Sequence, residues 1–375
     1  MSAVSERLPV FPWDKLEPYK ATAAAHADGI VDLSVGTPVD PVPDLIQKAL
    51  VAAADSPGYP TVWGTPELRD ALVSWCERRL GARGFTHRNV LPTVGSKELV
   101  AWLPTQLGLG PGDVVAYPRL AYPTYEVGAR LARADYVAYD TETFAADAAG
   151  SDLDPTNLKL LWLNSPSNPT GRVLAKDELI RIVAWAREHG VLVVSDECYL
   201  ELGWDAEPVS VLHPEVCGGS YEGLVAVHSL SKRSNLAGYR FAFLAGDEGL
   251  LHDLLQIRKH GGMMTAAPVQ AAAAVALGDD AHVAEQRARY AARRDALRDA
   301  LVAHGFRIEH SEASLYLWAT RDENCWDTVA HLAGLGILVA PGDFYGTAGE
   351  RFVRVAFTAT DERVEAAVRR LTAAG

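Results

Sequence analysis

Cysteine is scarce in this chain of 375 residues. The four cysteines, Cys76, Cys198, Cys217 and Cys325, lie far apart, and no two of them have the two-residue spacing of a thiolate metal site. This scarcity argues against a disulfide scaffold and a structural zinc centre, and it favours a reducing compartment. The eleven histidines lack the His-Glu-x-x-His spacing of a metalloenzyme, so we expect no metal ion.

Positive charge and long apolar runs are also in short supply. The chain has 35 lysines and arginines and 48 aspartates and glutamates, which gives a formal net charge of −13. Such a field repels phosphate polymers and anionic lipids, so we expect no nucleic-acid or membrane partner. The longest apolar stretch, Ala266–Leu277, is too short to cross a bilayer. Met1–Lys20 carries proline and acidic residues where a signal peptide has an apolar core, so we expect a cytoplasmic protein.

What the chain does contain is a series of short apolar runs with the length of buried strands. Seven precede the last third of the chain: Asn89–Val94, Asp113–Tyr117, Ala134–Tyr139, Lys159–Leu163, Val191–Ser195, Leu224–His228 and Arg240–Ala245. Helical patterns lie between them, of which Lys176–His189 is the clearest, with Gly190 placed to end it. The strand–helix–strand order over Lys159–Ser195 predicts parallel strands with covered faces. The sequence therefore predicts an α/β fold, with a large, doubly wound domain over residues 45–265.

The last third of the chain has a different order of elements. A long helix around Val283–His304 is followed by four short strands and by a final amphipathic helix, Asp361–Leu371. The strands are expected at Gly305–Glu309, Leu315–Ala319, Ile337–Ala340 and Phe352–Ala356. We expect residues 266–375 to form an interdomain helix and a smaller α+β domain. Residues 1–44 are expected to hold a proline-rich, extended arm and the start of the small domain.

Polar residues follow four of the predicted strands. The segments are Gly95–Glu98, Asn164–Gly171, Asp196–Tyr199 and Ser229–Lys232. In a parallel sheet, all four lie at the carboxyl edge, where α/β proteins bind ligands. Their convergence predicts a binding site.

The stretch from Ser229 to Arg240 is the most informative of these. A lysine at a strand end, close to other cations and desolvated, has a lowered pKa and becomes a nucleophile. Ser229, Ser231 and Arg240 could together hold a phosphate, the arginine through two parallel hydrogen bonds. A solvated loop with incidental serines is the alternative interpretation.

This stretch resembles the pyridoxal-phosphate lysine motif of class I aminotransferases, with Lys232 as the lysine. The similarity extends along the chain: Asn168-Pro-Thr-Gly171 resembles the family's Asn-Pro-x-Gly loop, and Asp196-Glu-Cys-Tyr199 its Asp-x-x-Tyr motif. Tyr59, in Gly-Tyr-Pro-Thr-Val-Trp-Gly-Thr-Pro, and Arg354, in Phe-Val-Arg-Val-Ala-Phe, also stand in patterns of this group. The resemblance implies the fold of pyridoxal-phosphate-dependent transferases: a mainly parallel seven-stranded sheet between helices, and a smaller α+β domain.

The resemblance also implies roles at the cofactor ring. Lys232 would bond to the cofactor and later move the proton at the substrate Cα. Asp196 would keep the ring nitrogen protonated, and Asn168 and Tyr199 would hydrogen-bond the ring oxygen. Tyr122 would stack on the ring. Tyr125, three residues later, competes for that role, although a core position is the more common outcome for one of two such tyrosines.

Further residues are implied for the phosphate and the substrate. Ser96 and the backbone N–H of Lys97, at an expected helix start, would bind the phosphate together with Ser229, Ser231 and Arg240. Tyr59 would reach this phosphate from a second subunit, so a homodimer is expected. Gly36 would let the backbone approach the substrate, and Arg354 would bind its α-carboxylate, with Asn168 beside it.

The resemblance implies an aminotransferase that exchanges an amino group between an amino acid, with glutamate as the expected donor, and a 2-oxo acid by a ping-pong mechanism. The segment Leu33–Pro43 looks most like the N-succinyldiaminopimelate aminotransferase group of lysine biosynthesis. Another amino-acid aminotransferase, of aspartate or aromatic type, and a β-lyase remain as alternatives. A non-enzymatic, ligand-sensing protein on this fold is opposed by the intact Lys232.

Overall fold

The computed structural model describes residues 4–9 and 12–374. Its largest element is a seven-stranded sheet in the order β2-β8-β7-β6-β5-β3-β4. These strands are β2 (Val90–Thr93), β3 (Val114–Pro118), β4 (Asp135–Tyr139), β5 (Leu158–Asn164), β6 (Leu192–Asp196), β7 (Leu224–Ser229) and β8 (Ala242–Gly246). Only β8 runs against its two neighbours, β2 and β7. The predicted α/β fold with a mainly parallel sheet is confirmed.

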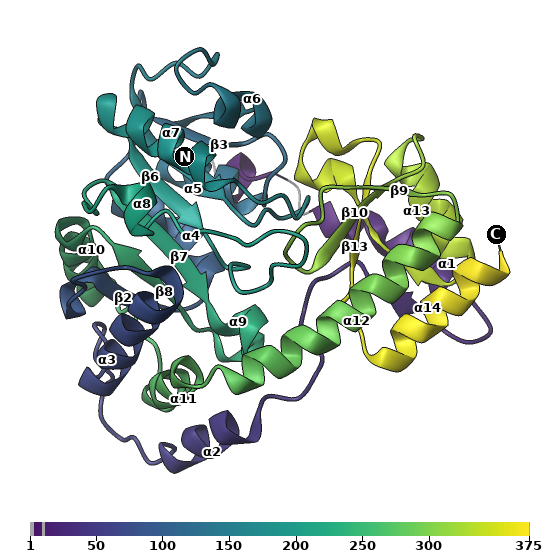
Figure 1. The fold of residues 1–375 in the computed structure, drawn as a ribbon, viewed down its shortest axis with the longest axis horizontal. Coiled ribbons are helices and arrows are strands. Elements are labelled where there is room, and N and C mark those ends of the chain that lie inside the picture. The colour runs from purple at the N-terminus through teal and green to yellow at the C-terminus, as the bar shows by residue number, and fades with distance from the viewer. Residues whose placement is uncertain (1–3, 10–11, 375) are drawn as a thin grey trace.

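Helices cover both faces of this sheet (Figure 1). The helices of this part are α2 (Asp44–Ala52), α3 (Pro66–Trp75), α4 (Ser96–Gln106), α5 (Thr124–Ala132), α6 (Thr141–Ala146), α7 (Lys176–Glu188), α8 (Pro214–Cys217), α9 (Leu230–Arg233), α10 (Glu248–Gly261) and α11 (Ala267–Gly278). Apolar side chains of α4, α5 and α10 pack on one face, and those of α2, α3, α7 and α11 pack on the other. Because both faces are covered, strands such as β5 read as continuous apolar runs.

A second, smaller part lies beside the large sheet (Figure 1). Its four-stranded antiparallel sheet has the order β12-β13-β10-β9, and β1 pairs in parallel with β11. The strands are β1 (Val31–Asp32), β9 (Arg307–Glu309), β10 (Tyr316–Thr320), β11 (Ile337–Leu338), β12 (Ala340–Pro341) and β13 (Val353–Ala356). The helices are α1 (Glu17–Ala24), α12 (Ala281–Ala303), α13 (Cys325–Gly334) and α14 (Asp361–Ala373). The long helix α12 runs from the large part to this one.

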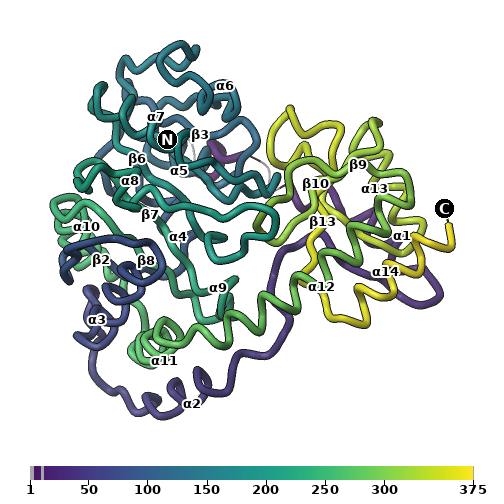
Figure 2. The backbone as a smooth tube through the Cα atoms, in the orientation of Figure 1, coloured from purple at the N-terminus to yellow at the C-terminus, as the bar shows by residue number. Residues whose placement is uncertain are grey.

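The start of the chain differs from the expected extended arm. Pro12 begins a 3-10 helix that ends at Leu16, and Pro18 lies in the first turn of α1. Proline suits a first helical turn because its missing N–H has no intrahelical acceptor there. The prediction of an extended arm was therefore wrong for the described residues. The short 3-10 helix Val4–Arg7 lies against α5 of the large part, where the carbonyl of Arg7 accepts a hydrogen bond from Arg130, whereas α1 packs on α13. Figure 2 shows the chain passing from α1 to α2.

The expected boundary between residues 265 and 266 stays a prediction. Helix α11 follows it directly and packs against α2 and α3, on the side of the large sheet. No helix in the part of the chain that the structure describes is long and apolar enough to cross a membrane.

Candidate active site

A cavity of about 570 Å³ lies at the carboxyl ends of the parallel strands, where they meet the smaller part. The structure brings twelve of the thirteen predicted site residues together around it: Gly36, Ser96, Lys97, Tyr122, Asn168, Asp196, Tyr199, Ser229, Ser231, Lys232, Arg240 and Arg354. The thirteenth, Tyr59, is 98% exposed and does not line this cavity. The convergence follows from sheet register, since Asn164 pairs with Asp196 at the ends of β5 and β6.

Lys232 enters the cavity from α9, the single helical turn that follows β7. Its Nζ donates a hydrogen bond to the carbonyl oxygen of Gly36. Burial lowers the pKa of Lys232, and the guanidinium groups of Arg354 and Arg240 act in the same direction. A lysine that loses its proton more readily is a better nucleophile and a better proton acceptor.

Asp196, at the end of β6, is 7% exposed. One carboxylate oxygen accepts from the Tyr125 hydroxyl at 2.8 Å, and the other accepts from the backbone N–H of Cys198 at 3.2 Å. Burial raises the pKa of this carboxyl group. Since none of the described residues forms an ion pair with it, Asp196 is suited to a protonated nitrogen in the cavity.

Tyr125 resolves an alternative left open by the sequence. Its side chain is fully buried and stacks on Trp162 with ring centroids 4.9 Å apart, so it is a core residue. Its hydroxyl bonds to Asp196 at the cavity wall, while Tyr122, which is only half-buried, also lines the cavity and is the tyrosine left to stack on a cofactor ring. The hydrogen bond from Tyr125 to Asp196 was not predicted, because two tyrosines three residues apart do not indicate which group each hydroxyl contacts.

The expected phosphate ligands gather at two helix starts. Ser96 begins α4, and Ser229 caps α9, accepting a hydrogen bond from the backbone N–H of Ser231 at 3.1 Å. Arg240 is exposed and lines the same cavity. Gly95, which has φ +77°, leaves room for the Arg240 guanidinium, because a Cβ at position 95 would overlap this group. The role of Gly95 was not predicted; a glycine directly before the helix-starting serine was the available signal.

Arg354, on β13, is 4% exposed and forms no ion pair with any described residue. Its two terminal nitrogens donate to the side-chain oxygen of Asn168 and to the carbonyl of Ser34, both at 2.8 Å. Its Nε has no hydrogen-bond partner among these residues. A buried guanidinium without a carboxylate is suited to an anionic ligand. The Asn168 oxygen is thus engaged, which leaves its amide NH₂ for a cofactor ring oxygen.

Tyr316, on β10, is a further cavity residue that sequence reasoning missed. Its hydroxyl lies 2.9 Å from that of Tyr199, and its ring lies 4.0 Å from the Arg354 guanidinium carbon. Burial alone would raise the pKa of Tyr316, but the charges of Arg354 and Lys232 outweigh it and the pKa is lowered. A Cβ at Gly36 would collide with this ring, which explains the glycine. Tyr316 therefore joins the cofactor end of the cavity to the Arg354 end.

The outer wall of the cavity comes from the N-terminal segment. Trp13, Leu16, Glu17 and Lys20 line it, and Lys20 forms an exposed ion pair with Glu17 at 3.7 Å. Sequence reasoning assigned no role to these residues, because their place opposite the strand ends depends on the packing of α1 on α13.

The chain belongs to the family of class I and II aminotransferases, whose model matches residues 28–371. It is 62% identical over 369 residues to the probable aminotransferase Rv1178 of Mycobacterium tuberculosis, covering 98% of this chain and 86% of that protein. It is 60% identical over 365 residues to the 4-dedimethylamino-4-oxo-anhydrotetracycline transaminase OxyQ of Streptomyces rimosus, covering 97% and 99%. An LL-diaminopimelate aminotransferase of Gloeobacter violaceus is 32% identical over 385 residues, covering 99% and 97%.

The fold agrees with this assignment. The crystal structure of an aminotransferase from Neisseria meningitidis matches with a TM-score of 0.89 and 29% identity, covering 100% of both chains. The protein is therefore a pyridoxal-phosphate-dependent aminotransferase. The donor set agrees with this cofactor: a lysine with a lowered pKa, a buried acid without a cation, and hydroxyls and an arginine near two helix starts.

Proposed function

We propose that this aminotransferase is N-succinyl-LL-2,6-diaminopimelate:2-oxoglutarate aminotransferase, an enzyme of lysine biosynthesis. The observation that supports an amino-acid substrate is the state of Arg354, a buried cation with no carboxylate partner among the described residues. Lys20, on the outer wall of the cavity, would face the distal succinyl carboxylate of a long substrate. The similarity to LL-diaminopimelate aminotransferases and the sequence of Leu33–Pro43 support the same substrate class.

The proposed roles of the residues follow their surroundings. Pyridoxal phosphate, when bound, carries the amino group and accepts electron density from the substrate. Lys232 takes the proton from the substrate Cα, since burial lowers its pKa and makes the neutral amine, which can accept a proton, easier to form. Asp196 would hold a proton on the ring nitrogen, and the Tyr125 hydroxyl orients the Asp196 carboxylate. Arg354 would bind the α-carboxylate and so hold the substrate Cα in the cavity that Lys232 enters.

The test is a half-reaction screen followed by absorbance. The yellow enzyme should bleach with glutamate, recover with 2-oxoglutarate, and bleach again with N-succinyl-LL-2,6-diaminopimelate. Bleaching by glutamate without any response to the succinylated substrate would overturn the specificity and leave the aminotransferase assignment intact. Release of ammonia or a thiol without bleaching would instead indicate a β-lyase.

A bulky cyclic ketone is a second candidate acceptor. The 60% identity to the 4-dedimethylamino-4-oxo-anhydrotetracycline transaminase OxyQ favours it, and so do the aromatic side chains of Trp13, Tyr122 and Tyr316 around the cavity. The aminated enzyme should then recover its yellow colour with a polycyclic aromatic ketone faster than with 2-oxoglutarate. The opposite order would exclude this candidate.

A homodimer and a cytoplasmic location belong to the same proposal. The exposed side chain of Tyr59 supports a dimer, because an aromatic residue 98% exposed in one chain is free to meet a second copy. The acidic net charge of −13 supports a protein without nucleic-acid partners.

A further inference from the structure

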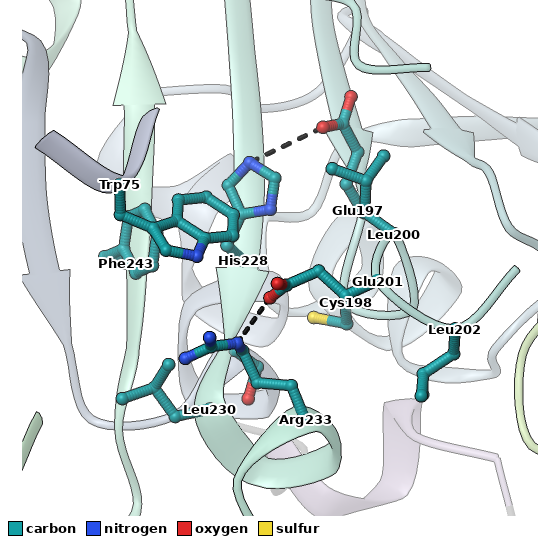
Figure 3. A pocket seen from close by; sticks show the side chains of 11 residues that line it. Trp75, Glu197, Cys198, Leu200, Glu201, Leu202, His228, Leu230, Arg233 and Phe243 are labelled. Carbon is teal, nitrogen blue, oxygen red and sulfur yellow. Dashed lines mark ion pairs between the residues drawn. The ribbon is translucent and has the colours of Figure 1, made fainter. Parts of the chain in front are cut away.

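A buried polar cluster lies directly behind the cavity, at the ends of β6 and β7 (Figure 3). Its polar members are Glu197, Glu201, His228 and Arg233, and Trp75 and Phe243 pack around them. Each polar residue is within two positions of a cavity residue in the sequence. Glu197 follows Asp196, Glu201 comes two after Tyr199, His228 precedes Ser229, and Arg233 follows Lys232.

Two pairs of these residues cross from one strand end to the other, as the dashed lines in Figure 3 show. Arg233 pairs with Glu201, and both side chains are 5% exposed. His228 lies 3.4 Å from Glu197, with exposures of 4% and 1%. The two segments that carry Asp196, Tyr199, Ser229 and Lys232 are therefore joined behind the site.

The two pairs differ in charge. Burial lowers the pKa of His228 to about 3, so this imidazole is neutral at neutral pH. Burial also lowers the pKa of Arg233, but the carboxylate of Glu201 opposes that effect and keeps the guanidinium charged. The Glu201–Arg233 pair is thus the charged link between the two segments.

Helix α9 needs such a link. It has four residues, so its own hydrogen bonds do little to fix its orientation. Arg233 anchors it further, donating to the carbonyl of Ala276 at 3.0 Å, while Arg79 holds Glu201 at 3.1 Å. Stability alone is a poor reason for this arrangement, because an apolar pair of similar volume is often as stable as a buried ion pair.

We propose that Arg233 and Glu201 are positioning residues, whose ion pair holds α9 so that the Lys232 nitrogen faces the cofactor bound between Asp196 and Tyr199. This inference rests on the cofactor assignment. Neither residue lines the cavity that contains Lys232, so neither touches the substrate or the cofactor; they act through Lys232.

The test compares holoenzymes of Arg233→Met and Glu201→Gln with the parent. Arg294→Met is the matched control, since Arg294 is also 5% exposed and paired with an aspartate, Asp205, but lies on α12. The measurements are melting temperature, cofactor affinity by fluorescence quenching, and the pH midpoint of the visible cofactor band. That midpoint reports protonation of the Lys232 nitrogen.

The two variants should shift this midpoint in opposite directions. Glu201→Gln removes the carboxylate that neutralises Arg233 and leaves it only the half-exposed Asp280, at 3.8 Å. The uncompensated cation disfavours the protonated form of Lys232 and lowers the midpoint by about one pH unit. Arg233→Met removes a cation next to Lys232 and leaves Glu201 paired with Arg79 alone, which raises the midpoint. Cofactor affinity should fall about ten-fold in both, and Arg233→Lys should recover most of it. Arg294→Met should lower the melting temperature and change neither of the other two readouts.

Two results would overturn the proposal. One is that Arg233→Met and Glu201→Gln both fold and keep the parental pH midpoint and the parental cofactor affinity. The other is a shift of the same sign in both variants that Arg294→Met reproduces, since that would report general loosening of the fold. If a single variant does not fold, the double variant Glu201→Leu/Arg233→Met removes both buried charges, and the only former partner of Glu201 that remains is Arg79, whose side chain is 38% exposed. The double variant should be as stable as the parent and bind the cofactor more weakly, and parental affinity in it would refute positioning.

Discussion

At the scale of single residues, the site depends on groups whose partners come from elsewhere in the fold. Asp196 is placed by its strand, but its charge is governed by burial and by the hydroxyl of Tyr125. Lys232 is likewise placed by one turn of helix, and its pKa is lowered by burial and by two arginines, against the opposing effect of Tyr316. Each residue therefore needs its surroundings to be chemically useful.

Replacing Tyr125 by phenylalanine should weaken cofactor binding. The Tyr125 hydroxyl stabilises ionised Asp196, and a hydrogen bond to a charged group is worth about 1.5–3 kcal/mol, so affinity should fall about ten- to hundred-fold. Fluorescence quenching by pyridoxal phosphate measures this loss. Tyr139→Phe is the control, since its buried hydroxyl donates to the carbonyl of Trp162 outside the cavity and its loss should spare affinity. Equal losses in the two variants would contradict the role of Tyr125.

Gly95 offers a second test at this scale. Alanine at Gly95 would strain a backbone at φ +77° and overlap the Arg240 guanidinium, so binding of pyridoxal phosphate should weaken by at least about ten-fold. Gly84→Ala has the same backbone strain at φ +71° with no neighbour within 4 Å. Both variants should lose about 1–2 kcal/mol of stability, but only Gly95→Ala should lose affinity. If Gly95→Ala bound pyridoxal phosphate with the parental affinity, the proposed role of Arg240 as a phosphate ligand would be wrong.

At the scale of elements, the strands of the large sheet were predictable to within two residues. β5 and β6 are apolar on both faces, so a run of consecutive apolar residues marks each of them, as Leu160–Leu163 does for β5. The predicted strand Ile337–Ala340 instead divides into β11 and β12, which pair with different partners. That division depends on tertiary pairing and leaves no signal in a four-residue run.

The residues of the site also fall into those that the sequence predicted and those that depend on tertiary packing. Lys232, Asp196 and Asn168 follow strands in recognisable motifs, so the sequence predicted them. Tyr316 and Trp13 reach the cavity only through the packing of the smaller part on the larger one. No local pattern distinguishes Tyr316 from any other residue of a buried strand.

The loop after β6 should give the protein a measurable dependence of stability on pH. Burial raises the pKa of Glu197 to about 7, while its carboxylate accepts from the backbone of Val211 at 2.9 Å. A folded-state pKa above the unfolded value stabilises the fold below pH 4.5, and this contribution is lost as pH rises to about 7. His228 contributes a pH dependence of stability in the opposite direction. Its folded pKa of about 3 lies below its unfolded value of 6.5, so the stability that it contributes is lost as pH falls.

Glu197→Gln isolates the first of these effects. Glutamine keeps the acceptor for Val211 and cannot ionise, so the variant should gain about 2–4 kcal/mol relative to the parent between pH 5 and pH 8. Urea unfolding of both proteins at the two pH values measures the difference. The exposed Glu215→Gln should show no such gain, because its carboxylate pairs with Lys176 at the surface. A constant difference for Glu197→Gln would show that its carboxyl group is ionised at both pH values.

At the scale of the whole molecule, the site is incomplete within one chain if Tyr59 acts as the resemblance implies. Every other predicted site residue lines one cavity, whereas Tyr59 projects into solvent in the segment before α3. We therefore predict a homodimer in which Tyr59→Phe loses a hydrogen bond to the partner's bound phosphate, at a cost of about 1.5–3 kcal/mol in cofactor affinity. Sedimentation with and without pyridoxal phosphate tests the dimer.

Subunit exchange tests the shared site itself. Lys232→Ala should abolish turnover, and Tyr59→Phe should be nearly inactive when the cofactor is kept below its weakened dissociation constant. A mixed dimer then has one site with both defects and one with neither, because each site takes Lys232 from one chain and Tyr59 from the other. Activity should thus return toward about a quarter of the parental value, since half of the dimers are mixed and half of their sites are intact. If tagged subunits exchange and no activity returns, Tyr59 acts within its own chain or has no role in the site.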